Sequence, residues 1–318
     1  MIEQKLLEYY QSLGKEFHLL LEALLSQKSG KQLHPLRVNL KKQLALFDLL
    51  ATLDEGFALK TVPKPAKKIM KATSTLRDAR VGAQLANIFE QHLLLTPRFS
   101  KRIKAEQKSR LKSSLKVVNK IPISQVQAVE GVVNECLNNL SGRVDLWPRL
   151  HHYYHDQTDL VRRIGESILE KEKEKNLHRF RKALKALMFN LLLLKKLAPE
   201  LRALKPVLKS FDEFQSLLGD WNDRVVLLEK MRKDKRKVSK ALKQLVKHER
   251  LRLFFDILEK LEGFSAFCLE IQQHLYELFA KPVQEKMEKK AAFVPTRINR
   301  KVERFPSPKK TDNHQKPT

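Results

Sequence analysis

Residues 33–50 read LHPLRVNLKKQLALFDLL, and residues 177–194 read LHRFRKALKALMFNLLLL. The two segments align without a gap at an offset of 144 residues. The aligned pairs include Leu33 with Leu177, His34 with His178, Arg37 with Arg181, Leu40 with Leu184, and Lys41 with Lys185. Self-similarity at a fixed offset is typical of a repeated structural unit, so these segments indicate a repeat architecture.

A second pair of similar segments follows about forty residues later in each half. Residues 75–81 read TLRDARV and residues 220–226 read DWNDRVV, which aligns Asp78 with Asp223 at an offset of 145. Two similarities in the same order, at nearly the same offset, predict that the chain contains a duplicated unit of about 144 residues.

Helical periodicity fills most of the chain. Its 318 residues include only nine glycines and thirteen prolines, and helix-forming residues such as Leu, Lys, Glu and Ala dominate. We therefore expect an all-α fold. Apolar spacing and turn signals predict helices over residues 2–28, 32–54, 64–95, 98–119, 122–139, 146–173, 175–197, 202–233, 238–261 and 263–290.

On a helical wheel, each His-containing segment separates into an apolar face and a cationic face. The apolar faces comprise Leu33, Leu36, Leu40, Leu44 and Phe47 in the first segment and Leu177, Phe180, Leu184, Leu187 and Leu191 in the second. The cationic faces comprise His34, Arg37 and Lys41, with Lys42 at the edge, and His178, Arg181, Lys182 and Lys185. Each half thus presents a helix that is apolar where it packs and cationic on the other side.

Two interpretations of these cationic faces compete. Lysine and arginine cover the solvated faces of many helices in basic proteins, and such a face needs no ligand. Like charges one helical turn apart repel each other by a few tenths of a kcal/mol, however, so a cluster of them has to be compensated. A solvated face does not require the order His–x2–Arg–x3–Lys twice, and the repetition favours a bound polyanion.

The charge balance points to the same class of ligand. The chain carries 63 Lys and Arg against 36 Asp and Glu, a formal net charge of +27, which predicts attraction to phosphate polymers or anionic membranes. The most apolar run, residues 186–194, is too short to span a membrane, and the N-terminal residues do not resemble a signal peptide. Cys136 and Cys268 lack the spacing of a disulfide framework or a zinc site. We expect a cytoplasmic protein.

The segments HPLRVNLKK with RDARV, and HRFRKALK with LLGDWND, resemble the CHAD family, the conserved-histidine α-helical domains. The resemblance covers residues 1–290, with halves at 1–142 and 143–290, and leaves residues 291–318 as a basic tail that we expect to be disordered. It implies two pseudo-symmetric antiparallel four-helix bundles from an internal duplication, with a basic cavity between them. It also implies non-catalytic binding of inorganic polyphosphate, in a family often associated with polyphosphate granules.

The resemblance also assigns roles to residues. It implies that phosphate is contacted by His34, Arg37, Lys41, Lys42, Arg77, His178, Arg181, Lys182 and Lys185. Carboxylates repel phosphate, so we expect Asp78 and Asp223 either to orient a neighbouring arginine or to cap a helical turn.

This sequence departs from the family pattern at two places. Residues 186–189 read ALMF where the family typically continues Arg-x-Arg-Tyr, and lysine occupies positions 41 and 42 where arginine is commoner. Lysine binds phosphate as a point charge and lacks the bidentate geometry of arginine. We therefore expect the second half to bind less tightly than in a typical member.

Other motifs in the chain carry less weight. The segment HHYYH at 151–155 places histidines one turn apart but lacks the carboxylate of an HExxH site, so we expect no metal. We find no phosphate-binding Gly-rich loop, nucleophile elbow or paired acids, and we expect neither a cofactor nor an enzyme.

Two alternatives stay open. A nucleic-acid binder is favoured by the charge, which also predicts weak non-specific binding of nucleic acid, but it is weakened by the few aromatic residues. A phosphohydrolase or phosphotransferase would use the histidines.

Overall fold

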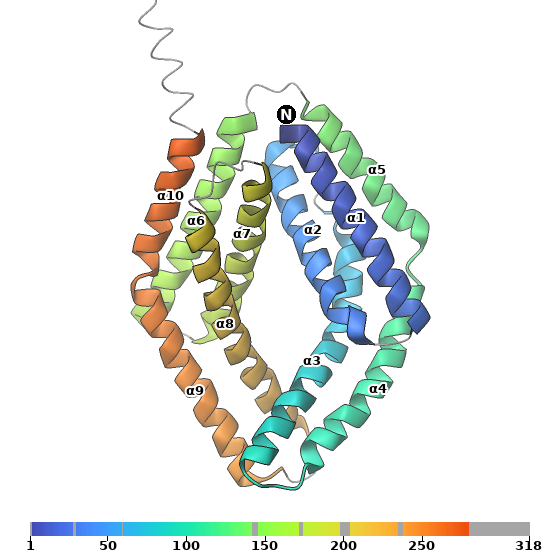
Figure 1. Cartoon of the computed structure of the whole chain (residues 1–318), viewed down its shortest axis with the longest axis vertical. Helices are drawn as coiled ribbons and strands as arrows, with labels where there is room; N and C mark the ends of the chain where they lie inside the picture. The colour runs from blue at the N-terminus through green and yellow to red at the C-terminus, as the bar shows by residue number, and fades with distance from the viewer. Residues whose placement is uncertain are drawn as a thin grey trace, which may run out of the picture.

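The computed structural model describes residues 2–27, 30–58, 60–141, 146–171, 174–197, 204–234 and 238–279. Within these ranges the chain is all-α, with ten α-helices, two short 3-10 helices and no strand (Figure 1). None of the described helices is long and apolar enough to cross a membrane. The predicted tail at 291–318, and the part of the last predicted helix beyond residue 279, lie outside the described residues.

The helix order is the same in the two halves. The first half contains α1 (Ile2–Gln27), η1 (Gly30–Gln32), α2 (Leu33–Leu53), α3 (Lys64–His92), α4 (Arg98–Asn119) and α5 (Ile123–Asn139). The second contains α6 (Leu146–Lys171), η2 (Glu174–Asn176), α7 (Leu177–Leu197), α8 (Leu204–Lys233), α9 (Lys240–Glu262) and α10 (Phe264–Phe279). Helices α6 and α7 begin and end 144 residues after α1 and α2, as the sequence offset predicts. That this correspondence arose by duplication stays an inference from the sequence.

Each half is a bundle of four helical segments in which the fourth segment is interrupted. In the first half Pro122 separates α4 from α5, and it cannot continue a helix because it lacks a backbone N–H. In the second half α9 ends at Gly263, directly before α10 begins. The structure thus has five α-helices per half within the described residues, where the resemblance implies four.

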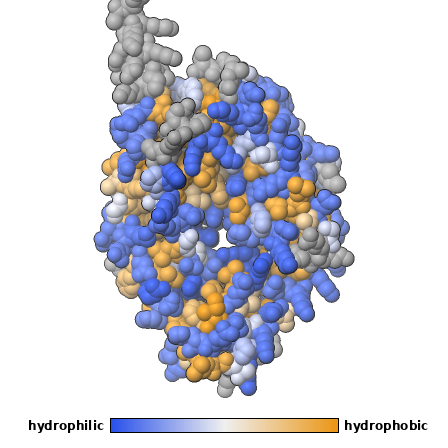
Figure 2. Space-filling model, viewed as in Figure 1, coloured by the Kyte–Doolittle hydropathy of each residue, from blue (hydrophilic) through white to orange (hydrophobic). Residues whose placement is uncertain are grey.

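Two apolar clusters join the halves. The largest cluster includes Phe47 of α2 and Leu187 of α7, and these two helices pack on each other near one end of the molecule (Figure 1). A smaller cluster joins Ala86 of α3 to Leu227 of α8 at the other end. The space-filling view shows the surface hollowed near the centre of the molecule, between these two junctions (Figure 2).

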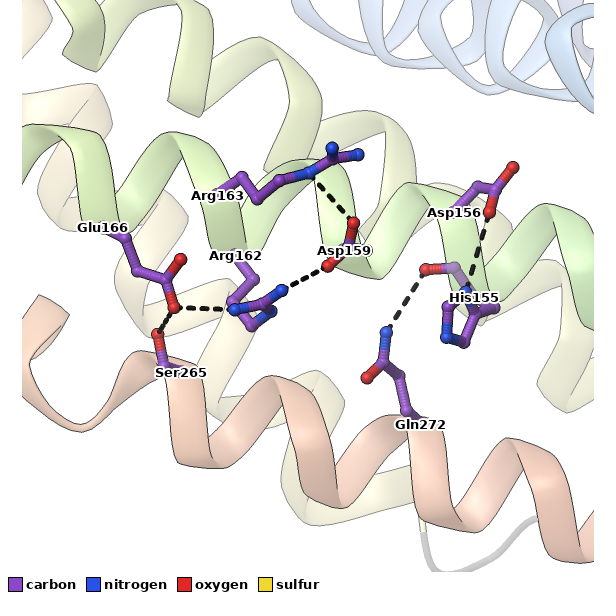
Figure 3. Close-up of polar contacts among 8 residues, drawn as sticks. All are labelled: His155, Asp156, Asp159, Arg162, Arg163, Glu166, Ser265 and Gln272. Atoms are coloured by element: carbon purple, nitrogen blue, oxygen red, sulfur yellow. Dashed lines mark hydrogen bonds and ion pairs between the residues drawn. The ribbon is translucent and has the colours of Figure 1, made fainter.

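The outer edge of the second half is held by polar contacts as well as by apolar packing. Arg162 of α6 donates to Glu166 at 2.8 Å and also binds Asp159, and Ser265 of α10 donates to the same Glu166 at 2.9 Å (Figure 3). Gln272 of α10 donates to a backbone carbonyl of α6. This seam fixes α10 against α6 on the side of the bundle that faces away from the first half.

Candidate anion-binding site

The two motif helices bury their apolar faces as predicted. On α2, Leu33, Leu36 and Leu40 are buried, and Leu44 packs against the core at partial exposure. On α7, the matching residues Leu177, Phe180, Leu184, Leu187 and Leu191 are all fully buried. These buried side chains fix the rotation of each helix and therefore the direction of its cationic face.

Arg37 is held firmly by the neighbouring helix. Its Nη1 donates to the backbone oxygen of Met70 at 2.7 Å and to Thr73 Oγ1 at 2.8 Å, both on α3. Burial lowers the pKa of Arg37, nearby Arg77 lowers it further, and Asp78 partly opposes this. The two hydrogen bonds therefore hold the guanidinium in place, and they replace only part of the hydration that it loses on burial.

Arg77 of α3 is shared by two carboxylates, one from each half. Its Nη1 lies 2.6 Å from Asp223 Oδ1 on α8 and 3.3 Å from Asp78 Oδ1 on its own helix. Burial would lower the pKa of Arg77, but Asp223 and Asp78 outweigh burial and raise it. Both aspartates lie in the interior of their helices, so of the two roles expected for them the structure favours the ion pair over the helix cap.

Lys41 and Lys185 bring the two halves into direct electrostatic contact. Burial lowers the pKa of Lys41 to about 7, and Lys185, Arg37, Arg181 and Arg77 each lower it further. The charged groups that act on Lys41 most strongly are all cations. The pKa of Lys185 is lowered by burial and by Arg181, with Asp212 opposing.

The guanidinium of Arg181, which comes from α7, lies over α8. Its Nη2 is 3.9 Å from the position that a Cβ would take at Gly219 of α8. Burial and Arg77 lower the pKa of Arg181, while Asp223 opposes them. Its Nε is buried and has no hydrogen-bond partner among the described residues, although buried polar groups are nearly always paired.

His34 and His178 are the second residues of α2 and α7, one in each half. The side chain of His34 is exposed for the most part. Its partial burial lowers its pKa, and so do the nearby charges of Lys41, Lys185, Arg77 and Arg80. The pKa of His178 is lowered by partial burial, Lys182 and Arg181, while a hydrogen bond with Asn222 opposes this shift. The neighbouring cations thus disfavour the protonated form of both histidines in the protein alone.

We name the five half-buried side chains that meet here the cation cluster: Arg37, Lys41, Arg77, Arg181 and Lys185. Lys182 is exposed and lowers the pKa of His178, and no described contact joins the half-buried Lys42 to the cluster. The sequence analysis missed Arg80, which donates to the backbone oxygen of Gly30 at 2.8 Å and acts on His34. Its position three residues after Arg77 puts it on a neighbouring part of the same helical face, and that spacing could have identified it.

The histidine-rich segment of α6 lies away from the cation cluster. His152 Nε2 is 3.2 Å from Asp156 Oδ2, and His155 Nδ1 is 3.6 Å from the other oxygen of the same carboxylate. In the part of the chain that the structure describes, no three His, Cys, Asp or Glu side chains are placed to hold a metal ion.

Comparison with protein families matches residues 11–232 to the CHAD domain. The chain belongs to the CHAD domain family. A solved relative, the crystal structure of the CHAD domain from the plant Ricinus communis, aligns with a TM-score of 0.62 at 14% sequence identity. The alignment covers 84% of this chain and 91% of that one, so the two share a fold. No curated protein matches the sequence.

The CHAD membership confirms the family inferred from the two His-centred motifs. Its matched range begins in α1 and ends in α8, and it includes every residue of the cation cluster. The family match therefore spans the parts of both halves that bring these cations together.

Proposed function

We propose that this CHAD protein binds inorganic polyphosphate in the cation cluster and does not catalyse a reaction on it. The observation that carries the proposal is Lys41, a half-buried ammonium on which the strongest electrostatic influences come from four other cations. Bringing like charges together out of water costs free energy, which an anion at the same place would offset. The family resemblance implies the same ligand.

The arrangement suits a linear anion better than a single phosphate. The cations come from three helices, α2, α3 and α7, and His34 and His178 lie on two of these helices next to them. Polyphosphate carries repeated charge and no bases, so it needs a row of donors on a rigid support rather than a surface that reads sequence.

Nucleic acid is the competing ligand, and aromatic residues distinguish the two. Proteins that bind single strands without sequence preference stack bases on exposed aromatic side chains. The aromatic ring described beside the cluster, Phe189 under the ammonium of Lys185, is buried. The exposed rings of Trp147, Phe255 and Tyr276 lie on α6, α9 and α10.

A binding competition tests the proposal. Long-chain polyphosphate and single-stranded RNA, matched in total phosphate, compete for the protein at near-physiological salt. We expect polyphosphate to win, with an affinity that falls steeply as salt rises, as for other polyelectrolytes. Equal or tighter binding of RNA would overturn the proposal.

The absence of catalysis is tested separately. We expect no release of orthophosphate from polyphosphate with Mg²⁺ or Mn²⁺ present, because no activating base is paired with either histidine among the described contacts. Steady release that is lost on changing His34 or His178 would show an enzyme. In cells, we propose that the protein resides in the cytoplasm and collects at polyphosphate granules.

A further inference from the structure

A second cationic groove lies next to the cation cluster, between α3 and α4. It encloses a cavity of about 460 Å³. Its polar and charged lining residues are Arg80, Gln84 and Asn87 of α3 and Ser100, Lys101, Lys104 and Gln107 of α4. None of the residues that line it is a carboxylate, and the amide side chains add donors for an oxyanion.

Arg80 connects this groove to the cation cluster. Its side chain lines the groove, and its charge also acts on His34 at the edge of the cluster. A hydrogen bond of 2.8 Å to the backbone oxygen of Gly30 holds the guanidinium at the N-terminal end of the first motif helix. Arg80 therefore lies close to an anion that leaves the cluster past His34.

Helix α4 extends the groove as a row of lysines. Lys101, Lys104, Lys108, Lys112 and Lys116 are all exposed, and their spacing of three or four residues places them on one face. The row covers about 22 Å at the helical rise per residue. We call these five residues the α4 lysine row.

On the opposite face of α4, by contrast, cations form ion pairs with carboxylates. There a cavity of about 570 Å³ lies between α4 and α8. Arg102 pairs with Asp234 at 2.9 Å, and Lys230 lies 3.6 Å from Glu106. For Lys101 and Lys104 the structure describes no ion pair, so the α3–α4 groove differs in having cations without carboxylate partners.

The second half has no equivalent row. Helix α4 carries eight Lys and Arg against one Glu, a balance of +7. Its counterpart α9 carries six Lys and Arg against four Asp and Glu, a balance of +2. If the surface were basic only in general, both helices would carry a similar excess of positive charge. The larger excess lies on α4, and this gives an anionic chain one preferred direction along the molecule.

We infer that the α3–α4 groove, with Arg80, Lys101 and Lys104, is a second anion-binding segment that receives the part of a long polyphosphate chain leaving the cation cluster past His34. This inference rests on the proposed function, because it describes where the same ligand continues. It predicts that chain length matters, since a short chain fills the cluster alone and a long chain also occupies the groove.

The test compares tripolyphosphate with long-chain polyphosphate on the full-length protein. The variant Lys101→Gln/Lys104→Gln keeps helix-forming side chains and removes two positive charges. We expect it to bind long chains about thirtyfold more weakly, which corresponds to roughly 1 kcal/mol for each of the two lysines near an anionic surface. For long chains, the slope of log affinity against log salt concentration should become shallower by about two, as for the loss of phosphate contacts to nucleic acids. Binding of tripolyphosphate should be unchanged.

A matched control removes the same charge from the second half. Lys240 and Lys247 are exposed on α9, and we expect Lys240→Gln/Lys247→Gln to leave both affinities close to those of the unchanged protein. Unaltered long-chain binding by the groove variant, or an equal loss in the control, would overturn the inference while leaving the cluster as the site. If the unchanged protein binds neither chain length, the proposed function fails and the inference with it.

Discussion

Arg77 of α3 and Asp223 of α8 form an ion pair across the two halves, with 2.6 Å between Nη1 and Oδ1. In the sequence alignment Asp223 corresponds to Asp78, and the position that corresponds to Arg77 is Asn222. One arginine therefore serves two aspartates, and the second half contributes a carboxylate without an arginine of its own at that position. This pair connects the closure of the two halves to the placement of a cluster cation.

Replacing Asp223 by asparagine should destabilise the protein. Arg77 would lose its closest carboxylate while staying largely buried, and a hydrogen bond to a charged group contributes about 1.5 to 3 kcal/mol. We expect the free energy of unfolding, measured in urea, to decrease by an amount within that range. Asp220→Asn, which removes an exposed pair with Arg224, is the control and should change it by less than about 1 kcal/mol. Equal effects would show that the pair between the halves contributes no more than a surface contact.

Lys41 and Lys185 offer the cleanest test of the cluster, since neither is held by a described hydrogen bond as Arg37 is. The double variant Lys41→Gln/Lys185→Gln should weaken polyphosphate binding by roughly 3 kcal/mol or more, because each charge-assisted contact contributes about 1.5 to 3 kcal/mol. Relief of repulsion should leave the melting temperature unchanged or higher. Lys240→Gln/Lys247→Gln again supplies the charge-matched control, and a similar loss of binding there would mean that only net charge matters.

Binding should be accompanied by proton uptake. The pKa of Lys41 is about 7 in the protein alone, because burial and four cations disfavour its charged form. A bound polyanion favours the charged form and raises that pKa, so the complex holds more protons than the free protein above pH 7. Affinity should therefore fall as pH rises from 7 toward 9.

Calorimetry in two buffers of different ionisation enthalpy measures this uptake directly. At pH 8 the variant Lys41→Gln should take up about one proton fewer than the unchanged protein. The histidines, whose pKa values are also lowered, should add a second component below pH 7. Identical uptake by the variant and the unchanged protein at pH 8 would rule out Lys41 as the source.

The α2–α7 junction should depend on one buried amide. Asn190 of α7 donates to the backbone oxygen of Ala45 on α2 at 3.1 Å, and its own backbone oxygen accepts from Tyr154 at 2.8 Å. Asn190→Ala removes the hydrogen bond to Ala45 and the one to the Tyr153 hydroxyl from the core, and should cost about 1 to 3 kcal/mol in the free energy of unfolding. The exposed Asn119→Ala should have little effect. A mild result at Asn190 would indicate that apolar packing alone joins the two motif helices.

Local features of the fold were accessible from the sequence. Helix positions followed from apolar spacing and from Pro122 and Gly263, and the buried leucines of both motif helices followed from the wheel. The contacts between distant residues were not accessible in this way. Periodicity predicts that Lys41 shares a face with Arg37, but it contains no information on whether that face meets Lys185. Asp223 was assigned to orient an arginine, and only the folded chain shows that the arginine belongs to the other half.

The cation cluster is assembled from residues that lie far apart in the chain, and this determines when it forms. Arg37 and Lys41 are synthesised 144 residues before Arg181 and Lys185. A growing polypeptide emerges N-terminal part first, so the first half is exposed while its cations are still hydrated and far from their later neighbours. Repulsion between the cations of the two halves is encountered only when the second half docks, which makes docking a step sensitive to dissolved anions. Phosphate polymers present during synthesis would thus favour the completed protein over its half-made precursor.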